Sequence, residues 1–163
     1  MGGEYMNKYM KTAIDLSNRN LRTHDGGPFG ACVVKDGKII GRGSNHVIKN
    51  NDPTAHAEIM AIRDACAKTG SCNLSDCELY TSCYPCPMCL GAIMWANIKR
   101  VYYANTTQDA HDIGFKDGFI YEYLYALAKG KPDNKTVKFK SLNRKEANAI
   151  FKAYVKQKNK VTY

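Results

Sequence analysis

Four side chains in two short segments have the types and the spacing of a metal-dependent catalytic site. His56 and Glu58 lie two residues apart, and Cys86 and Cys89 follow in a proline-rich PCPMC segment that places Cys86 thirty positions after His56. Two thiolates three apart at the start of a helix project to the same side, and a histidine from another helix start can complete three ligands. The pattern predicts a zinc ion with a water as its fourth ligand.

The same pattern predicts a hydrolytic reaction. Bound zinc lowers the pKa of its water towards about 7 and so supplies a hydroxide nucleophile at neutral pH. Glu58 lies two residues past His56, close enough to reach that water without ligating the metal. We expect Glu58 to take the proton of the water and return it to a substrate.

The cysteines leave alternatives open. Cys83 and Cys86 are also three residues apart, and composition alone does not choose between the two pairs; the flanking prolines and the expected helix favour Cys86 and Cys89. A closed structural zinc site, with Cys83 or His46 as fourth ligand, is the other interpretation. The remaining cysteines are expected to be small buried or semi-exposed apolar residues: Cys32, Cys66, Cys72 and Cys77.

Hydrophobic periodicity and turn residues predict the elements that position these side chains. We expect helices over 5–21, 55–69, 86–96, 119–128 and 143–158, and strands over 31–34, 39–44, 78–81, 101–104 and 137–141. Thr54 is predicted to cap the second helix, and Asn143 with Glu146 resembles a capping box. This order predicts an α/β fold with a mixed sheet between helices and right-handed crossovers.

Length and composition predict one soluble domain over residues 1–163. The chain is long enough for one core and too short for two ordinary domains. No stretch of about 18 apolar residues and no signal-peptide pattern is present, so we expect a cytoplasmic protein without membrane association. Seven cysteines, an odd number, favour thiols and metal ligation in a reducing compartment over disulfides.

The net charge of +9 is concentrated near the C-terminus. Residues 1–128 hold 13 basic and 13 acidic side chains, whereas residues 129–163 hold 11 and 2. The body is neutral, and the expected helix over 143–158 is basic and amphipathic. A solvated lysine-rich helix is the favoured interpretation, and a nucleic-acid contact is the less favoured one.

The motif pair HxE and PCxxC is the signature of zinc base deaminases, and over roughly residues 5–155 the chain resembles the cytidine deaminase-like superfamily. Within it, the segments GGPFGA (26–31), NDPTAHAE (51–58) and GFKD (114–117) are most similar to bacterial guanine deaminases. The resemblance implies a three-layer α/β/α sandwich with a five-stranded mixed sheet and one zinc per subunit. It also implies a homodimer, in some members with an exchanged C-terminal segment.

The resemblance also implies roles for residues around the metal. It assigns stacking on a purine to Phe29, a hydrogen bond to the base edge to Asn45, proton transfer to the leaving amine to Asp117, pocket contacts to Ala57 and Trp95, and closure of the site to Tyr163. Structural interpretations stand beside these roles: core aromatics for Phe29 and Trp95, a turn residue for Asn45, a helix cap for Asp117 and a frayed end for Tyr163.

Two positions depart from the superfamily pattern. Tyr84 stands before the first motif proline, where a glutamate is usual, and Lys116 stands where the first of two adjacent acids often lies. Neither change removes an expected metal ligand. The first affects hydrogen bonding in the pocket or the choice of substrate, and the second leaves Asp117 as a single acid.

Together these features predict zinc-dependent hydrolytic deamination of guanine to xanthine and ammonia. The main alternative is a tRNA adenosine deaminase, which the basic tail favours and the neutral body disfavours. Deamination of another small base or nucleoside, such as guanosine or cytosine, stays open. A non-catalytic zinc-binding module is disfavoured because a structural site has no need of Glu58.

Overall fold

The computed structural model describes residues 6–131 and 135–162, which belong to two compact units, Met1–Asp117 and Gly118–Tyr163. The first unit contains every strand found in the described residues, and the second is helical. In chain order the elements are α1 (Lys8–Thr23), β1 (Gly30–Lys35), β2 (Lys38–Ser44), α2 (Val47–Asn50), α3 (Ala57–Thr69), β3 (Cys77–Cys83), α4 (Pro87–Trp95), β4 (Arg100–Asn105), α5 (Thr107–Asp112), α6 (Gly118–Ala128) and α7 (Arg144–Val155).

The sheet of the first unit is mixed, as predicted. Its strand order is β2-β1-β3-β4, with β1 antiparallel to both β2 and β3, and with β3 parallel to β4. The expectation of five strands is wrong for the described residues, where the sheet has four. Residues 137–141 are irregular, and Val137 and Phe139 are exposed, so this segment lacks the buried face that stabilises a strand.

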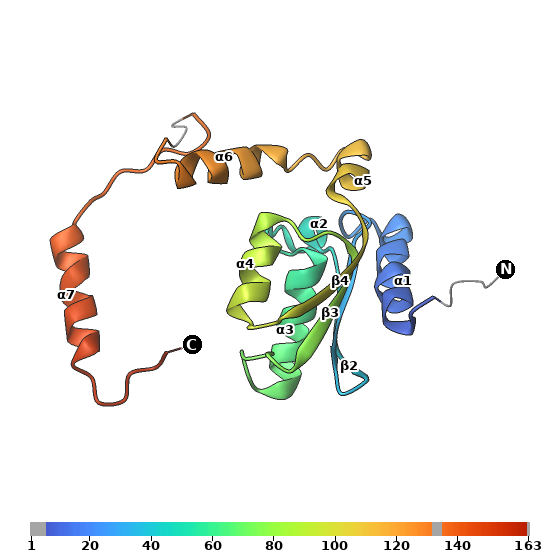
Figure 1. Cartoon of the computed structure of the whole chain (residues 1–163), viewed down its shortest axis with the longest axis horizontal. Helices are drawn as coiled ribbons and strands as arrows, with labels where there is room; N and C mark the ends of the chain where they lie inside the picture. Colours follow the sequence, from blue (N-terminus) through green and yellow to red (C-terminus); the bar gives the residue numbers. More distant parts are fainter. Residues whose placement is uncertain (1–5, 132–134, 163) are drawn as a thin grey trace. The chain divides into compact units, whose positions relative to one another are not determined.

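Helices cover both faces of this sheet (Figure 1). Side chains alternate along each strand: Val33 of β1 and Leu79 of β3 join the core under α3 and α4, whereas Cys32 and Tyr80 form a smaller core that includes α1 residues. The predicted α/β architecture with helices on the two faces is thus present in the first unit.

Two glycines of β2 allow α3 to lie directly against the sheet. A Cβ atom on Gly43 would lie 2.2 Å from the carbonyl oxygen of Ala57, and one on Gly41 would lie 2.4 Å from that of Ala61. No larger residue fits such an approach without moving the helix. The start of α3, where His56 and Glu58 lie, is therefore fixed by its contact with β2.

The predicted cap Thr54 is wrong, whereas Asn143 has the predicted N-cap position but makes no capping hydrogen bond. The amide and hydroxyl of Thr54 donate to Asp52 Oδ1 at 2.8 and 2.6 Å, and α3 begins three residues later, at Ala57, with His56 as its N-cap. Asn143 precedes α7 with a left-handed backbone, φ 50°, and its side chain makes no capping bond. An N-cap side chain reaches the helix amides from an extended backbone, which explains the missing bond.

The second unit contains α6 and α7, neither of which has a buried residue. Helix α7 ends at Val155, before the expected end at residue 158. The short helices α2 and α5 were not expected from the sequence. Among the residues that the structure describes, no helix is long and apolar enough to cross a membrane.

Candidate active site

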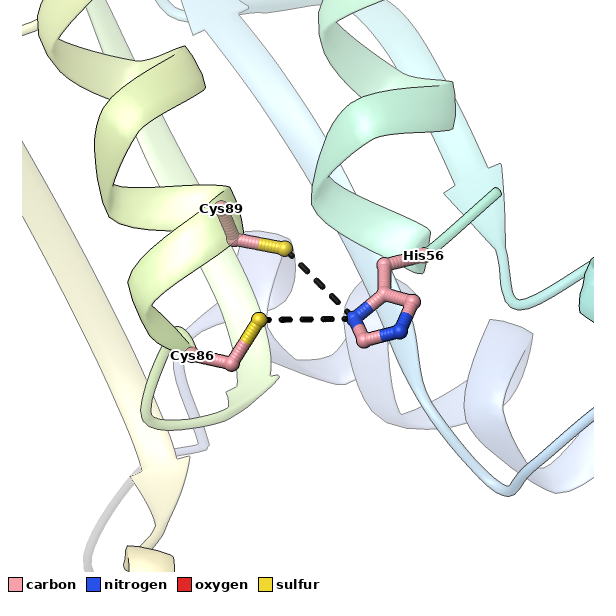
Figure 2. A group of neighbouring side chains, drawn as sticks. All are labelled: His56, Cys86 and Cys89. Atoms are coloured by element: carbon pink, nitrogen blue, oxygen red, sulfur yellow. Dashed lines mark hydrogen bonds between the residues drawn. The ribbon is translucent and has the colours of Figure 1, made fainter. Parts of the chain in front are cut away.

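The three predicted metal ligands lie at the N-termini of two neighbouring helices. His56 is the N-cap of α3 and Cys86 the N-cap of α4; both have an extended backbone. Pro87 occupies the first turn of α4, where a proline is tolerated because its missing N–H has no helical acceptor. Cys89 lies one turn along α4. Figure 2 shows the two sulfur atoms and the imidazole ring directed towards one another.

The distances between these donors fit one zinc ion. His56 Nδ1 lies 3.5 Å from Cys86 Sγ and 3.7 Å from Cys89 Sγ, and all three ligand atoms lie within 4.8 Å of one another. Tetrahedral zinc with Zn–S near 2.3 Å and Zn–N near 2.1 Å separates the two donors by about 3.6 Å. The chemistry and the geometry of this donor set therefore both suit zinc.

The electrostatics of the cluster favour its metal-binding form. A hydrogen bond from the Cys89 thiol lowers the pKa of Cys86 to about 4, whereas the same interaction raises the pKa of Cys89. The hydrogen bond with Cys86 raises the pKa of His56. One thiolate is thus already present near neutral pH, and a metal that replaces the shared protons completes the deprotonation.

Glu58 lies beside the ligands and is almost completely buried, with 6% of its surface exposed. Its Oε2 atom accepts a hydrogen bond from Cys89 Sγ at 3.4 Å, and its Oε1 atom accepts one from Thr81 Oγ1 at 3.2 Å. Burial raises the pKa of this carboxyl group. A carboxyl whose proton affinity is raised next to a metal cluster suits proton transfer. Thr81 was missed by sequence reasoning because only the strand register brings it to Glu58.

Asn45 and Phe29 are brought together by backbone hydrogen bonds. The amide of Asn45 donates to the carbonyl of Phe29 at 3.0 Å, and Asn45 is buried. Its Oδ1 accepts the amide of Val47 at 3.1 Å. On the other side, Asn20 Nδ2 of α1 donates to the carbonyls of Gly27 and Asn45 at 2.8 and 2.7 Å. Helix α1 therefore holds the two segments that the sequence assigned to substrate binding.

Phe29 has an aromatic partner that the sequence did not reveal. Phe115 meets it edge to face, with ring centroids 4.8 Å apart. A Cβ atom on Gly27 would lie 2.6 Å from the ring of Phe115 and 2.8 Å from that of Phe29. The GFKD segment is thus tied to the first glycine-rich loop through Phe115, a contact between segments far apart in the chain.

The two residues proposed as a fourth ligand make other contacts. The Cys83 thiol donates to the carbonyl of Thr106 at 3.4 Å, and burial raises its pKa to about 11. His46 Nε2 is 3.1 Å from Ser44 Oγ. Within the described residues the metal cluster contains only His56, Cys86 and Cys89, which favours the open zinc site over the closed one.

The comparison with protein families agrees with this geometry. Residues 4–105 match the family described as "Cytidine and deoxycytidylate deaminase zinc-binding region". The chain belongs to this deaminase family. The matched residues include the three ligands and Glu58.

Individual deaminases resemble the chain over different lengths. Guanine deaminase from Bacillus subtilis is 47% identical over 155 residues, which cover 95% of this chain and 97% of that protein. The X-ray structure of guanine deaminase from Bacillus subtilis superposes with a TM-score of 0.89, 45% identity and coverage of 98% and 99%. The tRNA-specific adenosine deaminase of Aquifex aeolicus is 38% identical over 104 residues, covering 64% of this chain and 66% of its own.

The other residues predicted for the deaminase site differ in burial and in their distance from the metal cluster. Ala57 is fully buried between His56 and Glu58. Asp117 lies close enough to His56 to contribute to its raised pKa. Trp95 is the last residue of α4 and is 68% exposed. It follows Cys86 by nine residues, so it lies about 13 Å from Cys86 along the helix axis. Tyr163 lies outside the described residues.

Tyr84, which replaces the usual glutamate, lies at the end of β3 beside the ligand segment. Its ring meets that of Tyr103 edge to face at 5.0 Å, and its amide donates to the carbonyl of Asn105 at 2.8 Å. The substitution therefore anchors the ligand segment of the deaminase to β4 and leaves the metal cluster intact.

Proposed function

We propose that this protein is a zinc-dependent hydrolase that deaminates guanine to xanthine and ammonia. The observation that carries the proposal is the position of Glu58, a buried carboxyl that lies 3.4 Å from a ligand sulfur without belonging to the metal cluster. The likeness to the Bacillus subtilis guanine deaminase extends over 95% of the chain, beyond the zinc-binding region, and supports guanine as the substrate.

The residues divide the chemistry between them. His56, Cys86 and Cys89 would hold the zinc, which would supply an activated water for attack on C2 of the purine. Glu58 takes up the proton of that water and delivers it to the ring nitrogen beside C2. Glu58 then takes up the proton of the hydroxyl added at C2 and, with Asp117 as a second acid, passes it to the exocyclic amine, which leaves as ammonia. Water and guanine together balance xanthine and ammonia.

Recognition of the base rests on the two segments that α1 holds together. Phe29 presents an aromatic ring for stacking, and Phe115 supports that ring from the side. Within the described residues the side-chain amide nitrogen of Asn45 makes no hydrogen bond, whereas Oδ1 is engaged by Val47. A free N–H donor from a buried position suits an acceptor on the edge of a purine.

We further propose a homodimer with exchanged C-terminal segments. Strand β4 ends the described sheet, and Tyr102 and Tyr103 on it are exposed. An edge strand of a sheet is a ready site for pairing with another chain.

The seven free cysteines fit a reducing cytoplasm.

Ammonia release tests the substrate. Zinc-loaded protein is offered guanine, guanosine, adenine, cytosine and tRNA in parallel, with Glu58→Gln as the matched variant. We expect guanine to be the preferred substrate and the variant to lose about 10²–10⁴-fold in kcat while keeping its zinc. Equal activity of the variant would refute the role of Glu58, and absence of guanine turnover would refute the substrate.

The tRNA arm addresses the second candidate, which the excess of basic residues after position 128 supports. Contacts with phosphates release counterions, so specific binding of tRNA weakens steeply as salt rises. Adenosine deamination in tRNA, lost with rising salt, would replace guanine as the assigned substrate. Turnover of guanine alone would assign the basic tail to the solvated surface.

A further inference from the structure

We infer that Thr81 is a positioning residue for the reaction: its hydroxyl holds one oxygen of Glu58 so that the other oxygen faces the metal cluster. The inference rests on the proposed function, in which Glu58 carries the proton. Neither Thr81 nor its contact with Glu58 belongs to the sequence motif that led to the site.

The strand register fixes Thr81 in place. In the middle of the sheet, Thr81 pairs with Ala31 of β1 on one side and with Tyr103 of β4 on the other. Since side chains alternate along a strand, Thr81 projects to the same face as Leu79, the face covered by α3. Its exposed fraction is 1%, so water does not compete for its hydroxyl.

The contacts of Glu58 show how this hydroxyl orients it. Thr81 Oγ1 lies 3.2 Å from Glu58 Oε1, and Oε2 lies 3.4 Å from Cys89 Sγ. A carboxyl group held at one oxygen loses the freedom to rotate its second oxygen away from the reacting centre. Thr81 therefore acts on the orientation of Glu58 and does not itself touch the substrate.

The hydroxyl has a second acceptor that fixes its own position. Thr81 Oγ1 also lies 3.1 Å from the carbonyl oxygen of Cys83. A hydroxyl has one hydrogen to donate and lone pairs with which to accept, so Glu58 and the carbonyl of Cys83 are the two polar groups within its reach. The backbone of β3 thus keeps the hydroxyl of Thr81 beside Glu58 Oε1.

Two substitutions of similar size separate the hydroxyl from the volume of the side chain. Thr81→Val keeps the shape and removes the hydroxyl, and Thr81→Ser keeps the hydroxyl. We expect Thr81→Val to lower kcat for guanine about 10–100-fold, the usual effect of losing a residue that orients a catalytic group, with KM and zinc content nearly unchanged. Thr81→Ser should restore most of the loss. Thr69→Val, which removes a hydroxyl bonded to the carbonyl of Ala65 at the other end of α3, is the matched control.

A double variant shows whether Thr81 acts through Glu58. If it does, Thr81→Val in the Glu58→Gln background costs no further activity, because the partner is already gone. A kcat for Thr81→Val within twofold of the unmodified enzyme would overturn the inference, as would an equal loss in Thr81→Ser. If Thr81→Val does not fold, the comparison of Thr81→Ser with Thr81→Ala decides by the same criteria. An unmodified enzyme that does not deaminate guanine would instead overturn the proposed function.

Discussion

The carboxyl group of Glu58 is held in an environment that opposes its charge. It is buried among Ala57, Thr81 and Cys89, with each oxygen engaged by one hydrogen bond. Desolvation destabilises the ionised form and so raises the pKa. A carboxyl with a raised pKa accepts a proton readily and releases it less readily. We therefore expect the pKa of Glu58 to set the acid limit of the reaction.

We expect kcat/KM for guanine to fall on the acid side at a pH above 4.5, the ordinary pKa of a glutamate. The sign follows from the role of Glu58: the ionised form accepts the proton of the water, and a raised pKa removes this form at a higher pH. A pH profile of kcat/KM, with zinc content measured at each pH, tests this. Activity that stays constant down to pH 4.5 would contradict it.

The cysteines differ in environment, and these differences predict the order in which their thiols react with a disulfide reagent. Cys72 is exposed, whereas Cys32, Cys77 and Cys83 are buried, and burial raises the pKa of each of these three thiols to about 11. Only thiolates react quickly with a disulfide reagent. In the zinc-loaded protein we therefore expect Cys72 to react first, and chelation of zinc to add Cys86, whose pKa is lowered to about 4 by the hydrogen bond from Cys89.

Time courses with Ellman's reagent, with and without a zinc chelator, measure this order. Cys72→Ser should remove the fast phase of the zinc-loaded protein. Cys86→Ser should remove the phase that chelation adds. If the chelator leaves the number of fast thiols unchanged, Cys86 is not a metal ligand.

At the scale of residues, the sequence predicted the site where chemistry restricts the residue type. The spacing of His56, Cys86 and Cys89 follows from helix geometry and the demands of zinc, and the structure brings the three together. Thr81 and Phe115 could not be found this way, because threonine and phenylalanine are common and their contacts depend on strand register and loop packing. The roles of Asp117, Trp95 and Tyr163 stay predictions.

At the scale of elements, helix α3 shows why the boundaries were harder to predict than the elements. The composition of residues 55–69 predicted the helix, and Thr54 is a favoured cap residue. Asp52 engages both the amide and the hydroxyl of Thr54 in a local turn, so the helix starts after His56. Local side-chain hydrogen bonds of this kind compete with helix capping, and the residue types alone do not specify which of them forms.

The contact between β2 and α3 predicts a strong effect of Gly43→Ala. The added Cβ atom would lie 2.2 Å from the carbonyl oxygen of Ala57, between the two residues that bear the metal ligand and the proton carrier. We expect a loss of about 1–3 kcal/mol in the free energy of unfolding, as for other overpacked sites, together with weaker zinc binding.

Denaturant unfolding and zinc titration of Gly43→Ala measure these effects. Gly91→Ala in α4 is the matched control, because a Cβ atom there meets nothing within 4 Å, and alanine favours a helix interior by about 0.5–1 kcal/mol over glycine. If both variants bind zinc as tightly as the unmodified protein, the close approach at Gly43 does not position the site.

At the scale of the whole molecule, the core clusters of the described residues lie in the first unit, whereas the helices of the second bury no residue. The sheet and its two helical layers bury two clusters of core residues, one on each face of the sheet, and this part of the fold followed from the order of the predicted elements. The expected strand over 137–141 failed because its β-prone residues lie in a unit whose helices bury no residue. A sequence pattern reports which residues favour burial, but it does not identify the surface that covers them.

The apolar residues of α7 provide the test of the proposed homodimer. Ile150, Phe151 and Val155 are 68%, 73% and 65% exposed, and their spacing places them on one side of the helix. Contiguous exposed apolar surface of this kind marks association in soluble proteins.

Sedimentation at micromolar concentration should give twice the chain mass of 18.2 kDa. Ile150→Glu with Phe151→Glu should shift the protein to the monomer, whereas Lys152→Ala, a change of a charged residue on the same helix, should not. A monomeric unmodified protein would exclude the dimer, and a dimer that both sets of substitutions leave intact would place its interface away from α7, with the free edge of β4 as the next surface to alter.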